Sequence, residues 1–501
     1  MGWKSLLIRP YAAYISRKID QMAGNAIRDQ HRIRESITAQ AAQTAFGKDH
    51  SFDQIHSYED FRKHIPINDY EGSKSYFDRV RDGEENVLWP GKPKYFAKTS
   101  GTTSGTKYIP ITSDSLSNHF NTARNALFHY GIKTGNLDFL NGKLIFLSGS
   151  PALENTNGIM TGRLSGIVNH EVPGWLKKNQ VPSWETNCIE DWEEKVEHIV
   201  EETRHLDLRL ISGIPPWVQM YYERLLKATG EKTILDIFPN YSVFVYGGVN
   251  FEPYRNQLET LTGGRIDSVE TYPASEGFIA FQDSYPHEGM LLNSRSGIFF
   301  EFIPASEFGQ ENAGRIALDE VKTGVEYVLI LNSNAGLWGY NLGDTVRFVS
   351  TDPYRLLVTG RIKHFISAFG EHVIGKEVEE ALHRTVARFP AEIVEFTVAP
   401  QVNPDSGLPY HEWFIEFGRE PENPSKFSEE LDRQMILQNS YYEDLITGRI
   451  LRPLIVTALK PNAFRNLMKS RGKLGGQNKV PRLANDRLIA ENLEAYKIED
   501  F

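Results

Sequence analysis

The sequence lacks several features that define large classes of protein. It contains one cysteine, Cys188, so no disulfide can form within the chain and a reducing compartment is favoured. No apolar run approaches the roughly 18 residues of a membrane span. The formal net charge of −10 argues against nucleic acid or an anionic membrane as the main partner, although a local basic patch stays open. We therefore expect a cytoplasmic protein with no nucleic-acid partner and no membrane partner.

Several motifs of hydrolytic enzymes are also absent from the sequence. There is no H-E-x-x-H, no Cys/His metal set and no G-x-S-x-G, so zinc hydrolase and serine hydrolase chemistry have no local support. What is present is the composition of a large globular protein: 501 residues, of which 40% are apolar and 12% aromatic. A chain of this length exceeds one compact core and predicts more than one domain.

The order of hydrophobic patterns predicts an α/β fold. Residues 11–46 carry apolar side chains at helical spacing, which predicts two packed helices. Between Leu144 and Val349, short β-rich runs alternate with helical stretches, and the later, closely spaced runs favour an antiparallel addition. After Gly360 the pattern restarts as a small α+β unit that ends with a helix near Lys469. We expect a large N-terminal domain over residues 1–360 and a small C-terminal lid over residues 361–501.

One stretch, Lys98 to Pro110, is dominated by Gly, Ser, Thr and Lys. Its glycines allow main-chain N–H groups to converge on an anion, while hydroxyls and Lys107 add donors and charge. The spacing differs from that of the usual nucleotide-triphosphatase loop. A flexible polar surface loop is the alternative, but apolar flanks place the stretch between two extended segments. The candidate phosphate-binding residues are Ser100, Gly101, Thr102, Thr103, Ser104, Gly105 and Lys107.

A carboxylate follows one of the predicted strands. Glu276, with Tyr272 and Ser275 just before it, would emerge at the end of a strand, where open α/β sheets bind ligands. A nucleotide-bound Mg²⁺ needs only one or two such carboxylates, so Glu276 is a candidate ligand. The alternative is a surface ion pair. Gly247 and Gly248 also follow a strand, where they would allow a flat ring to approach or would form a simple turn.

Two further polar clusters lie towards the C-terminus. Gly343 and Asp344 precede the predicted strand from Thr345; they indicate either a hairpin turn or a carboxylate that grips the hydroxyls of a ribose. Lys479 follows a glycine pair, which would let it reach a ligand. The alternative is an ordinary basic loop exposed to solvent.

An aromatic stretch offers a candidate wall for an acyl pocket. It extends from Leu210 to Tyr222 and includes Trp217 and Tyr221, which would suit an aryl or indolic acid. A helix that packs its apolar face into the core explains the same residues.

Taken in order, these clusters resemble the adenylate-forming superfamily, and more specifically the Gretchen Hagen (GH3) family of acyl-acid amido synthetases. Members of this family conjugate carboxylic-acid hormones such as auxin and jasmonate to amino acids in plants, and they have bacterial relatives. The resemblance covers nearly the whole chain: His64 to Glu71, Thr99 to Pro110, Tyr272 to Gly277, Tyr340 to Asp344 and Gln477 to Arg482. Asn341 departs from it, because plant members usually carry Arg there.

The resemblance implies an ATP- and Mg²⁺-dependent ligase. It would activate a small carboxylic acid as an acyl-adenylate, release pyrophosphate, and pass the acyl group to the amine of an amino acid with release of AMP. Ser100, Thr102, Thr103 and Lys107 would hold phosphates, and Glu276 would hold Mg²⁺. Asp344 would bind the ribose; Gly247, Gly248 and Tyr272 would flank the adenine. Lys479 would reach the reacting groups from the lid after rotation at a hinge near Arg361.

Two alternatives stay open from the sequence. A carboxylate-CoA ligase shares the adenylation step and uses a thiol acceptor. A catalytically silent ligand-binding relative shares the fold, but it would have no reason to keep Lys107, Glu276, Asp344 and Lys479 together. We expect a monomer.

Overall fold

The computed structural model describes the chain in ten stretches, residues 3–102, 105–172, 174–248, 251–285, 288–310, 313–361, 365–366, 368–371, 373–470 and 480–498. It divides into two compact units. The large unit comprises Met1–Thr99, Lys107–Glu190 and Lys195–Ile362, and the small unit comprises Ser100–Thr106, Asp191–Glu194 and Lys363–Phe501. Among the described residues, no helix combines the length and apolar character needed to cross a membrane.

The α-helices and 3-10 helices that precede Ile362 are α1 Trp3–Ala23, α2 Ala26–Ala41, α3 Ala45–Asp49, η1 Phe52–Gln54, α4 Tyr58–His64, α5 Lys74–Arg81, α6 Ser113–Thr134, η2 Asp138–Asn141, α7 Leu164–Glu171, α8 Gly174–Lys177, α9 Trp184–Asn187, α10 Trp192–Thr203, α11 Pro215–Thr229, α12 Ile234–Ile237, α13 Glu252–Thr262 and η3 Leu318–Glu320. Residues 11–46 thus hold most of α1, all of α2 and the start of α3, and the predicted helix pair begins eight residues earlier than expected. Capping chemistry explains several boundaries. Ser57 and Asp60 form a capping box at the start of α4, and Thr112 and Ser115 form one at α6.

The strands of this region are β1 Tyr95–Thr102, β2 Gly105–Ile111, β3 Lys143–Phe146, β4 Glu154–Thr156, β5 Ile159–Gly162, β6 Gln180–Val181, β7 Leu208–Ser212, β8 Val243–Gly247, β9 Asp267–Ala274, β10 Gly277–Phe281, β11 Met290–Leu292, β12 Ile298–Pro304, β13 Glu326–Ser333, β14 Tyr340–Thr351 and β15 Tyr354–Arg361. Eleven of them form one sheet in the order β12-β13-β14-β15-β11-β10-β9-β8-β7-β3-β6. The strands β6, β3, β7, β8 and β9 run parallel, whereas β10 to β15 pair antiparallel. The predicted α/β fold with an antiparallel addition is confirmed.

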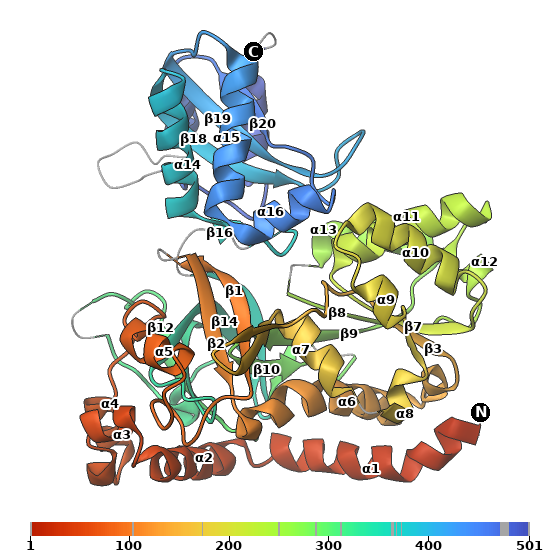
Figure 1. Cartoon of the computed structure of the whole chain (residues 1–501), viewed down its shortest axis with the longest axis vertical. Helices are drawn as coiled ribbons and strands as arrows, with labels where there is room; N and C mark the ends of the chain where they lie inside the picture. Colours follow the sequence, from red (N-terminus) through yellow and green to blue (C-terminus); the bar gives the residue numbers. More distant parts are fainter. Residues whose placement is uncertain are drawn as a thin grey trace. The chain divides into compact units, whose positions relative to one another are not determined.

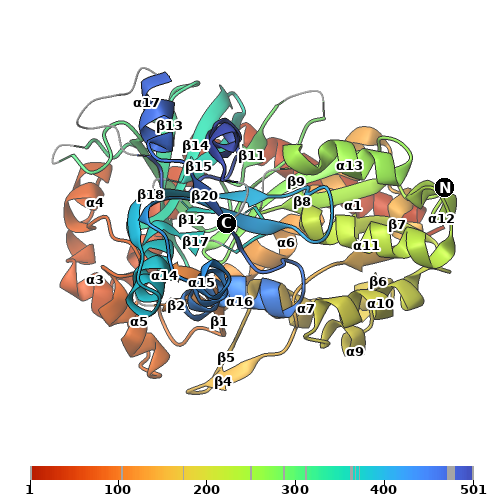
Figure 2. The same cartoon turned by 90° about the horizontal axis from the view of Figure 1, so that it is seen from above.

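Helices cover both faces of the parallel strands. Figures 1 and 2 show α10, α11 and α13 on one face and α6 on the other, with α1 beyond α6. The second layer is built from apolar side chains: Ala12, Ile15, Ile19 and Met22 of α1 share a buried cluster with Ala126, Phe128 and Tyr130 of α6. A larger core joins α2 to α5, the β1–β2 hairpin and the antiparallel strands. Cys188 is half-buried at the end of α9, in keeping with a structural role.

The small unit is an α+β fold. Its helices and strands are β16 Phe365–Ile366, β17 Val373–Ile374, α14 Gly375–Arg388, β18 Glu392–Gln401, β19 Tyr410–Arg419, α15 Pro424–Gln438, α16 Ser440–Thr447, β20 Ile455–Leu459, α17 Ala463–Ser470, α18 Leu488–Leu493 and η4 Glu494–Tyr496. The sequence placed the last helix near Lys469, and α18 shows that this was wrong. Its short run of Leu488 to Leu493 has too few turns to give a helical period.

A buried glutamate begins α14. Glu377 is 6% exposed, and its carboxylate accepts hydrogen bonds from the Ile374 amide at 2.9 Å and the Asn439 amide group at 3.0 Å. Burial raises the pKa of Glu377 to about 7, because the low-dielectric surroundings disfavour its charged form. This carboxyl group is therefore protonated at mildly acidic pH.

Candidate active site

The turn between β9 and β10 presents Glu276. These strands form an antiparallel hairpin in which Ala274 pairs with Gly277, so Ser275 and Glu276 make the turn. The Glu276 side chain is 7% exposed and accepts a hydrogen bond from the Tyr340 hydroxyl at 3.2 Å. Burial, followed by the charge of Glu276, raises the pKa of Tyr340 well above its usual value. Tyr340 thus stays a hydrogen-bond donor that orients this carboxylate.

Asp344 and Tyr272 meet beside this turn. The Tyr272 hydroxyl donates to the Asp344 carboxylate at 2.5 Å, and both side chains are buried. The sequence predicted a Gly-Asp turn before a strand at Thr345, and this boundary was wrong: β14 begins at Tyr340 and contains Asp344. Burial alternates along β14, which puts Asp344 on the same face of the strand as Tyr340. Two motifs about 70 residues apart in the sequence therefore lie side by side.

Gly247 and Gly248 lie at the carboxyl end of β8, next to β9 and Tyr272. A Cβ on Gly247 would lie 2.2 Å from the Thr271 carbonyl oxygen, so the close pairing of β8 with β9 requires glycine at this position. Gly248 differs, because it is exposed with φ of 82°, and the nearest atom to a Cβ there would be Ile214 Cγ2 at 3.8 Å. Gly247 thus allows β8 to pack closely against β9, whereas Gly248 is exposed to solvent.

The Gly/Ser/Thr stretch forms the hairpin between β1 and β2. Ser100, Gly101 and Thr102 continue β1, and Gly105 begins β2, so the strands extend further than the predicted flanks. Thr103 and Ser104 lie outside the described residues. Lys107 is half-buried on β2. The predicted long loop is therefore mostly strand, because Thr side chains pack readily in extended backbone.

A segment that the sequence did not assign to the site connects these motifs. Asn68 bridges to β14: its amide donates to the Gly339 carbonyl at 2.9 Å, and its carbonyl accepts from the Asn341 amide at 2.7 Å. Two residues later, the Tyr70 hydroxyl accepts from the Tyr108 amide of β2 at 3.1 Å. The segment 65–70 thus joins the β1–β2 hairpin to the strand that holds Asp344. The only sequence signal was the similarity of His64 to Glu71 to a family motif.

Helix α6 holds the β9–β10 turn in place through Asn118. The Phe278 amide donates to the Asn118 side-chain oxygen at 2.6 Å, and the Asn118 amide group donates back to the Phe278 carbonyl at 3.3 Å. Asn118 is buried, and its partner Phe278 follows closely after Glu276 at the start of β10. Sequence reasoning missed Asn118, because a single Asn in a helical pattern gives no signal of a distant strand.

The remaining predicted residues are placed as follows. Arg361 ends β15, where it pairs in register with Asp344 of β14, and Lys479 lies outside the described residues. The aromatic wall at residues 210–222 is corrected for Tyr221: it is fully buried and its hydroxyl forms a hydrogen bond with the Thr203 hydroxyl at 2.7 Å. Its helix, α11, packs this side chain into the core, so Tyr221 cannot line an open pocket.

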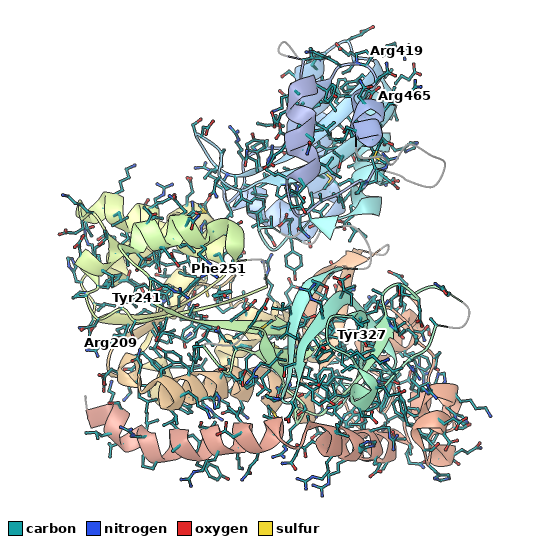
Figure 3. All side chains as sticks on the ribbon, turned by 180° about the vertical axis from the view of Figure 1, so that it is seen from behind. Arg209, Tyr241, Phe251, Tyr327, Arg419 and Arg465 are labelled. Carbon is teal, nitrogen blue, oxygen red and sulfur yellow. The ribbon has the colours of Figure 1, made fainter. Side chains whose placement is uncertain are left out.

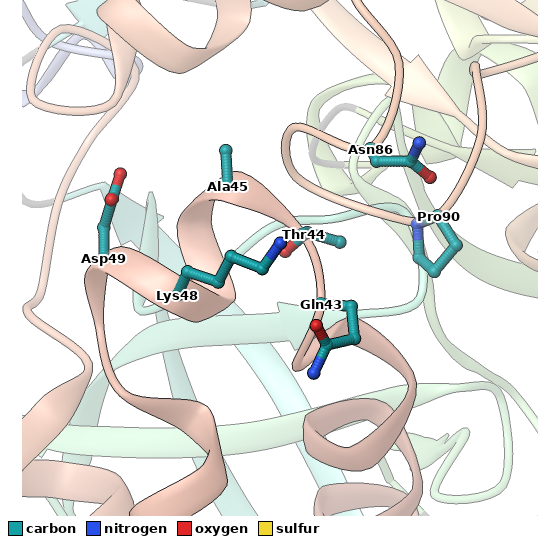
Figure 4. Close-up of a pocket in the computed structure, with 7 residues that line it drawn as sticks. All are labelled: Gln43, Thr44, Ala45, Lys48, Asp49, Asn86 and Pro90. Atoms are coloured by element: carbon teal, nitrogen blue, oxygen red, sulfur yellow. The ribbon is translucent and has the colours of Figure 1, made fainter.

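A hollow of about 630 Å³ lies apart from these motifs (Figure 4). The residues that line it are Gln43, Thr44, Ala45, Lys48, Asp49, Asn86 and Pro90. Several of its polar groups already have protein partners: Thr44 caps α3, the Asn86 side chain accepts from the Gly91 amide, and Tyr76 donates to Asp49. None of the predicted site residues that the structure describes lines it.

Comparisons with known proteins identify the family. Residues 15–198 match the GH3 family N-terminal domain, residues 291–361 its central domain, and residues 376–488 its C-terminal domain. The chain belongs to the GH3 family. This confirms the resemblance drawn from the sequence motifs.

Named GH3 relatives are amido synthetases. The indole-3-acetic acid-amido synthetase GH3.15 of Arabidopsis thaliana is 23% identical, with 96% of this chain and 94% of the relative covered. The jasmonoyl–L-amino acid synthetase JAR4 of Nicotiana attenuata is 24% identical over 69% of this chain and 72% of its own.

Solved structures share the GH3 fold. The GH3.15 acyl acid amido synthetase in complex with 2,4-DB has a TM-score of 0.63 at 17% identity, covering 97% of this chain and 96% of that one. A 2-hydroxyisobutyryl-CoA ligase has a TM-score of 0.60 at 13% identity, covering 93% and 92%. The fold is thus shared by enzymes whose names refer to amide and to thioester products.

Proposed function

We propose that this GH3 protein is an acid–amino acid ligase that acts through an acyl-adenylate. The carboxylate oxygen of a small acid attacks the α-phosphorus of ATP, and pyrophosphate leaves with the electrons of the broken P–O bond. The amine of an amino acid then attacks the acyl carbonyl, loses a proton, and displaces AMP. The enzyme class follows from family membership, since the named relatives are amido synthetases.

The observation that carries this proposal is the joining of four motifs within the large unit. Tyr340 binds Glu276, Tyr272 binds Asp344, and the segment with Asn68 and Tyr70 ties β14 to β2. The β9 end of this network borders the carboxyl ends of parallel strands, where α/β sheets bind ligands. A fold that kept no nucleotide chemistry would not need two buried carboxylates so near each other, because burial of charge is costly.

Specific roles follow for the residues around this network. Ser100, Gly101, Thr102, Thr103, Ser104, Gly105 and Lys107 would hold the β- and γ-phosphates on the β1–β2 hairpin. Asp344 would accept hydrogen bonds from the ribose, and Gly248, Tyr272 and Ser275 would border the adenine, with Gly247 setting the strand spacing. Lys479 would act from the C-terminal lid, residues 361–501, which would turn at Arg361 between half-reactions.

Magnesium would be held at Glu276. The described residues contain no cluster of three or more metal-ligating His, Cys, Asp or Glu side chains. A single carboxylate fits an ion that takes its other ligands from nucleotide phosphates and water. Bound there, Mg²⁺ would neutralise charge on the departing pyrophosphate. Tyr340 would keep the carboxylate pointed at the phosphates.

Isotope exchange between ATP and pyrophosphate tests the first half-reaction. The assay is run against a panel of small carboxylic acids, and then amino acids or CoA are added while AMP and products are followed by mass spectrometry. We expect exchange with one class of acid and amide formation that depends on an amino acid. Thioester formation with CoA would instead favour a carboxylate-CoA ligase. Absence of exchange together with absence of ATP binding by calorimetry would indicate a silent relative.

We further propose that the enzyme is a monomer of the reducing cytoplasm. A single cysteine favours a reducing compartment. Light scattering of the purified protein tests the oligomeric state, and a dimer mass would contradict it.

A further inference from the structure

Helix α1 exposes large apolar side chains on the face turned away from the protein. Leu6 is 56% exposed, Leu7 71%, Tyr11 47% and Tyr14 52%. The opposite face of the same helix is buried against α6. A helix that covers a core normally turns polar residues outward. The outer face of α1 is therefore available for an apolar partner.

This apolar face lies in a basic segment of an acidic protein. Residues 1–41, through the end of α2, contain seven Lys and Arg residues, two Asp and one Glu, while the whole chain has a net charge of −10. The whole-chain charge predicted no membrane partner, but this excess of positive charge at one end is the local basic patch that the prediction left open. It favours an anionic partner for this face.

A hollow of about 700 Å³ beside α2 is lined by positively charged side chains. Arg28 and Arg32 lie one helical turn apart at its edge, and Arg295 approaches from the loop before β12. Buried Asp29 fixes the guanidinium of Arg295, with Nη2 and Nε each 2.7 Å from Oδ2. Within the described parts of the chain, Arg28 and Arg32 have no acidic side chain within 4.0 Å. The hollow is thus lined by three arginines and one aspartate, and guanidinium groups can bind a phosphate bidentately.

The helices that carry the apolar and the basic features lie along one edge of the large unit. Figure 1 shows α1 and α2 in line there, with α6 above α1. We propose that this α1–α2 face docks on the surface of a bilayer that contains anionic phospholipids. Leu6, Leu7 and Tyr14 enter the headgroup region, and the arginine hollow binds a lipid phosphate.

Two other occupants fit the observations less well. A soluble phosphate compound would use the hollow but would leave the leucines of α1 without a partner. A second copy of the chain related by a twofold axis would bring the same basic patch against itself, which costs electrostatic energy. The bilayer accounts for both features, and this inference does not depend on the proposed ligase activity.

Vesicle sedimentation with the full chain tests the proposal. We expect binding to vesicles of phosphatidylcholine with phosphatidylserine, no binding to phosphatidylcholine alone, and release at high salt. The Arg28→Ala/Arg32→Ala variant should lose about thirtyfold in affinity, since each Arg near an anionic surface contributes about fivefold. The matched control is Arg419→Ala/Arg465→Ala, two exposed arginines of the small unit labelled in Figure 3, which should bind like the unchanged protein.

The apolar contribution is tested separately. Leu6→Ser/Leu7→Ser should weaken vesicle binding by about tenfold or more through lost apolar burial, whereas Leu437→Ser, a similarly exposed leucine on α15, should not. Circular dichroism and ATP–pyrophosphate exchange should be unchanged in all four variants, because these residues lie outside the proposed site.

Three results would overturn the docking proposal. Equal binding to neutral and anionic vesicles, or binding to neither, would remove the electrostatic basis. Binding of inorganic phosphate that depends on Arg28 and Arg32 without any vesicle binding would assign the hollow to a soluble anion. A dimer by light scattering that Leu6→Ser/Leu7→Ser converts to monomer would assign the face to a second copy.

Discussion

At the scale of single residues, the Glu276 carboxylate gives the sharpest prediction. Glu276→Gln keeps an oxygen that can accept from the Tyr340 hydroxyl, so the turn should fold as before. It removes the negative charge that would bind Mg²⁺, and we expect ATP–pyrophosphate exchange to fall by a factor of at least about 100, equivalent to several kcal/mol. Activity and thermal unfolding are measured together.

Glu326→Gln supplies the control for this charge change. Glu326 is an exposed carboxylate at the start of β13, and its replacement should change neither exchange nor melting temperature. If Glu276→Gln kept full exchange at limiting Mg²⁺, the assignment of Glu276 as metal ligand would be wrong.

Gly247 and Gly248 provide a matched pair of neighbouring substitutions. Gly247→Ala places a Cβ against the Thr271 carbonyl and should force β8 away from β9, at a cost of about 2 kcal/mol or more in the free energy of unfolding. Gly248→Ala has room for its Cβ and should cost about 1 kcal/mol through its positive φ alone. Urea unfolding of both variants distinguishes the two cases.

ATP affinity then tests the role of the outward glycine. Because Gly248→Ala should stay folded, a rise in its KM for ATP reports on the nucleotide site itself. Equal stability of the two variants would contradict the tight packing of Gly247.

At the scale of elements, the start of α14 predicts a pH-dependent stability. Glu377 has a pKa of about 7 in the folded state and an ordinary value of 4.5. Between these values the folded state binds more protons than the unfolded state, so the free energy of unfolding falls as pH rises from 4.5 to about 7. The upper bound of this loss is about 3 kcal/mol, from about 1.36 kcal/mol per pKa unit.

Glu377→Gln should flatten this dependence. A glutamine can still accept from the Ile374 amide, but it does not titrate. Urea unfolding of both proteins at about pH 5 and about pH 7.5, on either side of the folded-state pKa, measures the difference. An unchanged pH slope in the variant would show that another group is responsible.

Local sequence patterns predicted most helices and strands but not how the strands pair. The apolar runs at residues 298–303 and 327–331 predict two strands, and they match β12 and β13 to within two residues, because each strand is an almost continuous buried run. Asp344 was misplaced in a turn, since Gly343 has φ of 90° yet remains inside β14, where strand pairing overrides local turn preference.

Sequence motifs predicted the main residues of the candidate site, but only the fold shows which of them contact each other. Tyr272, Glu276, Tyr340 and Asp344 were marked by family resemblance, but their two hydrogen bonds come from strand register that no local pattern reports. Asn68 and Asn118 were missed for the same reason, because each contacts a part of the sheet that is far away in the sequence.

At the scale of the whole molecule, we expect substitution of Lys479 to impair the first half-reaction and to spare the second. If the lid supplies this lysine only for adenylation, Lys479→Ala should lose ATP–pyrophosphate exchange by about 100-fold or more, as expected for a charge that acts in the transition state. The same variant should still form amide from a chemically supplied acyl-adenylate and amino acid. Stopped-flow measurement of each half-reaction checks this, with Lys460→Ala as an exposed control on the same unit.

The bridge from Asn68 to β14 has a consequence for how the protein is made. The partner of Asn68 is synthesised about 270 residues later, which takes roughly 15 to 50 seconds at usual rates of translation. During that interval the emerging N-terminal segment lacks the antiparallel strands of the sheet, such as β12, where Phe299 packs against the buried side chain of Phe61. We therefore expect the large unit to complete its fold late in translation, and its N-terminal third to bind chaperones until then.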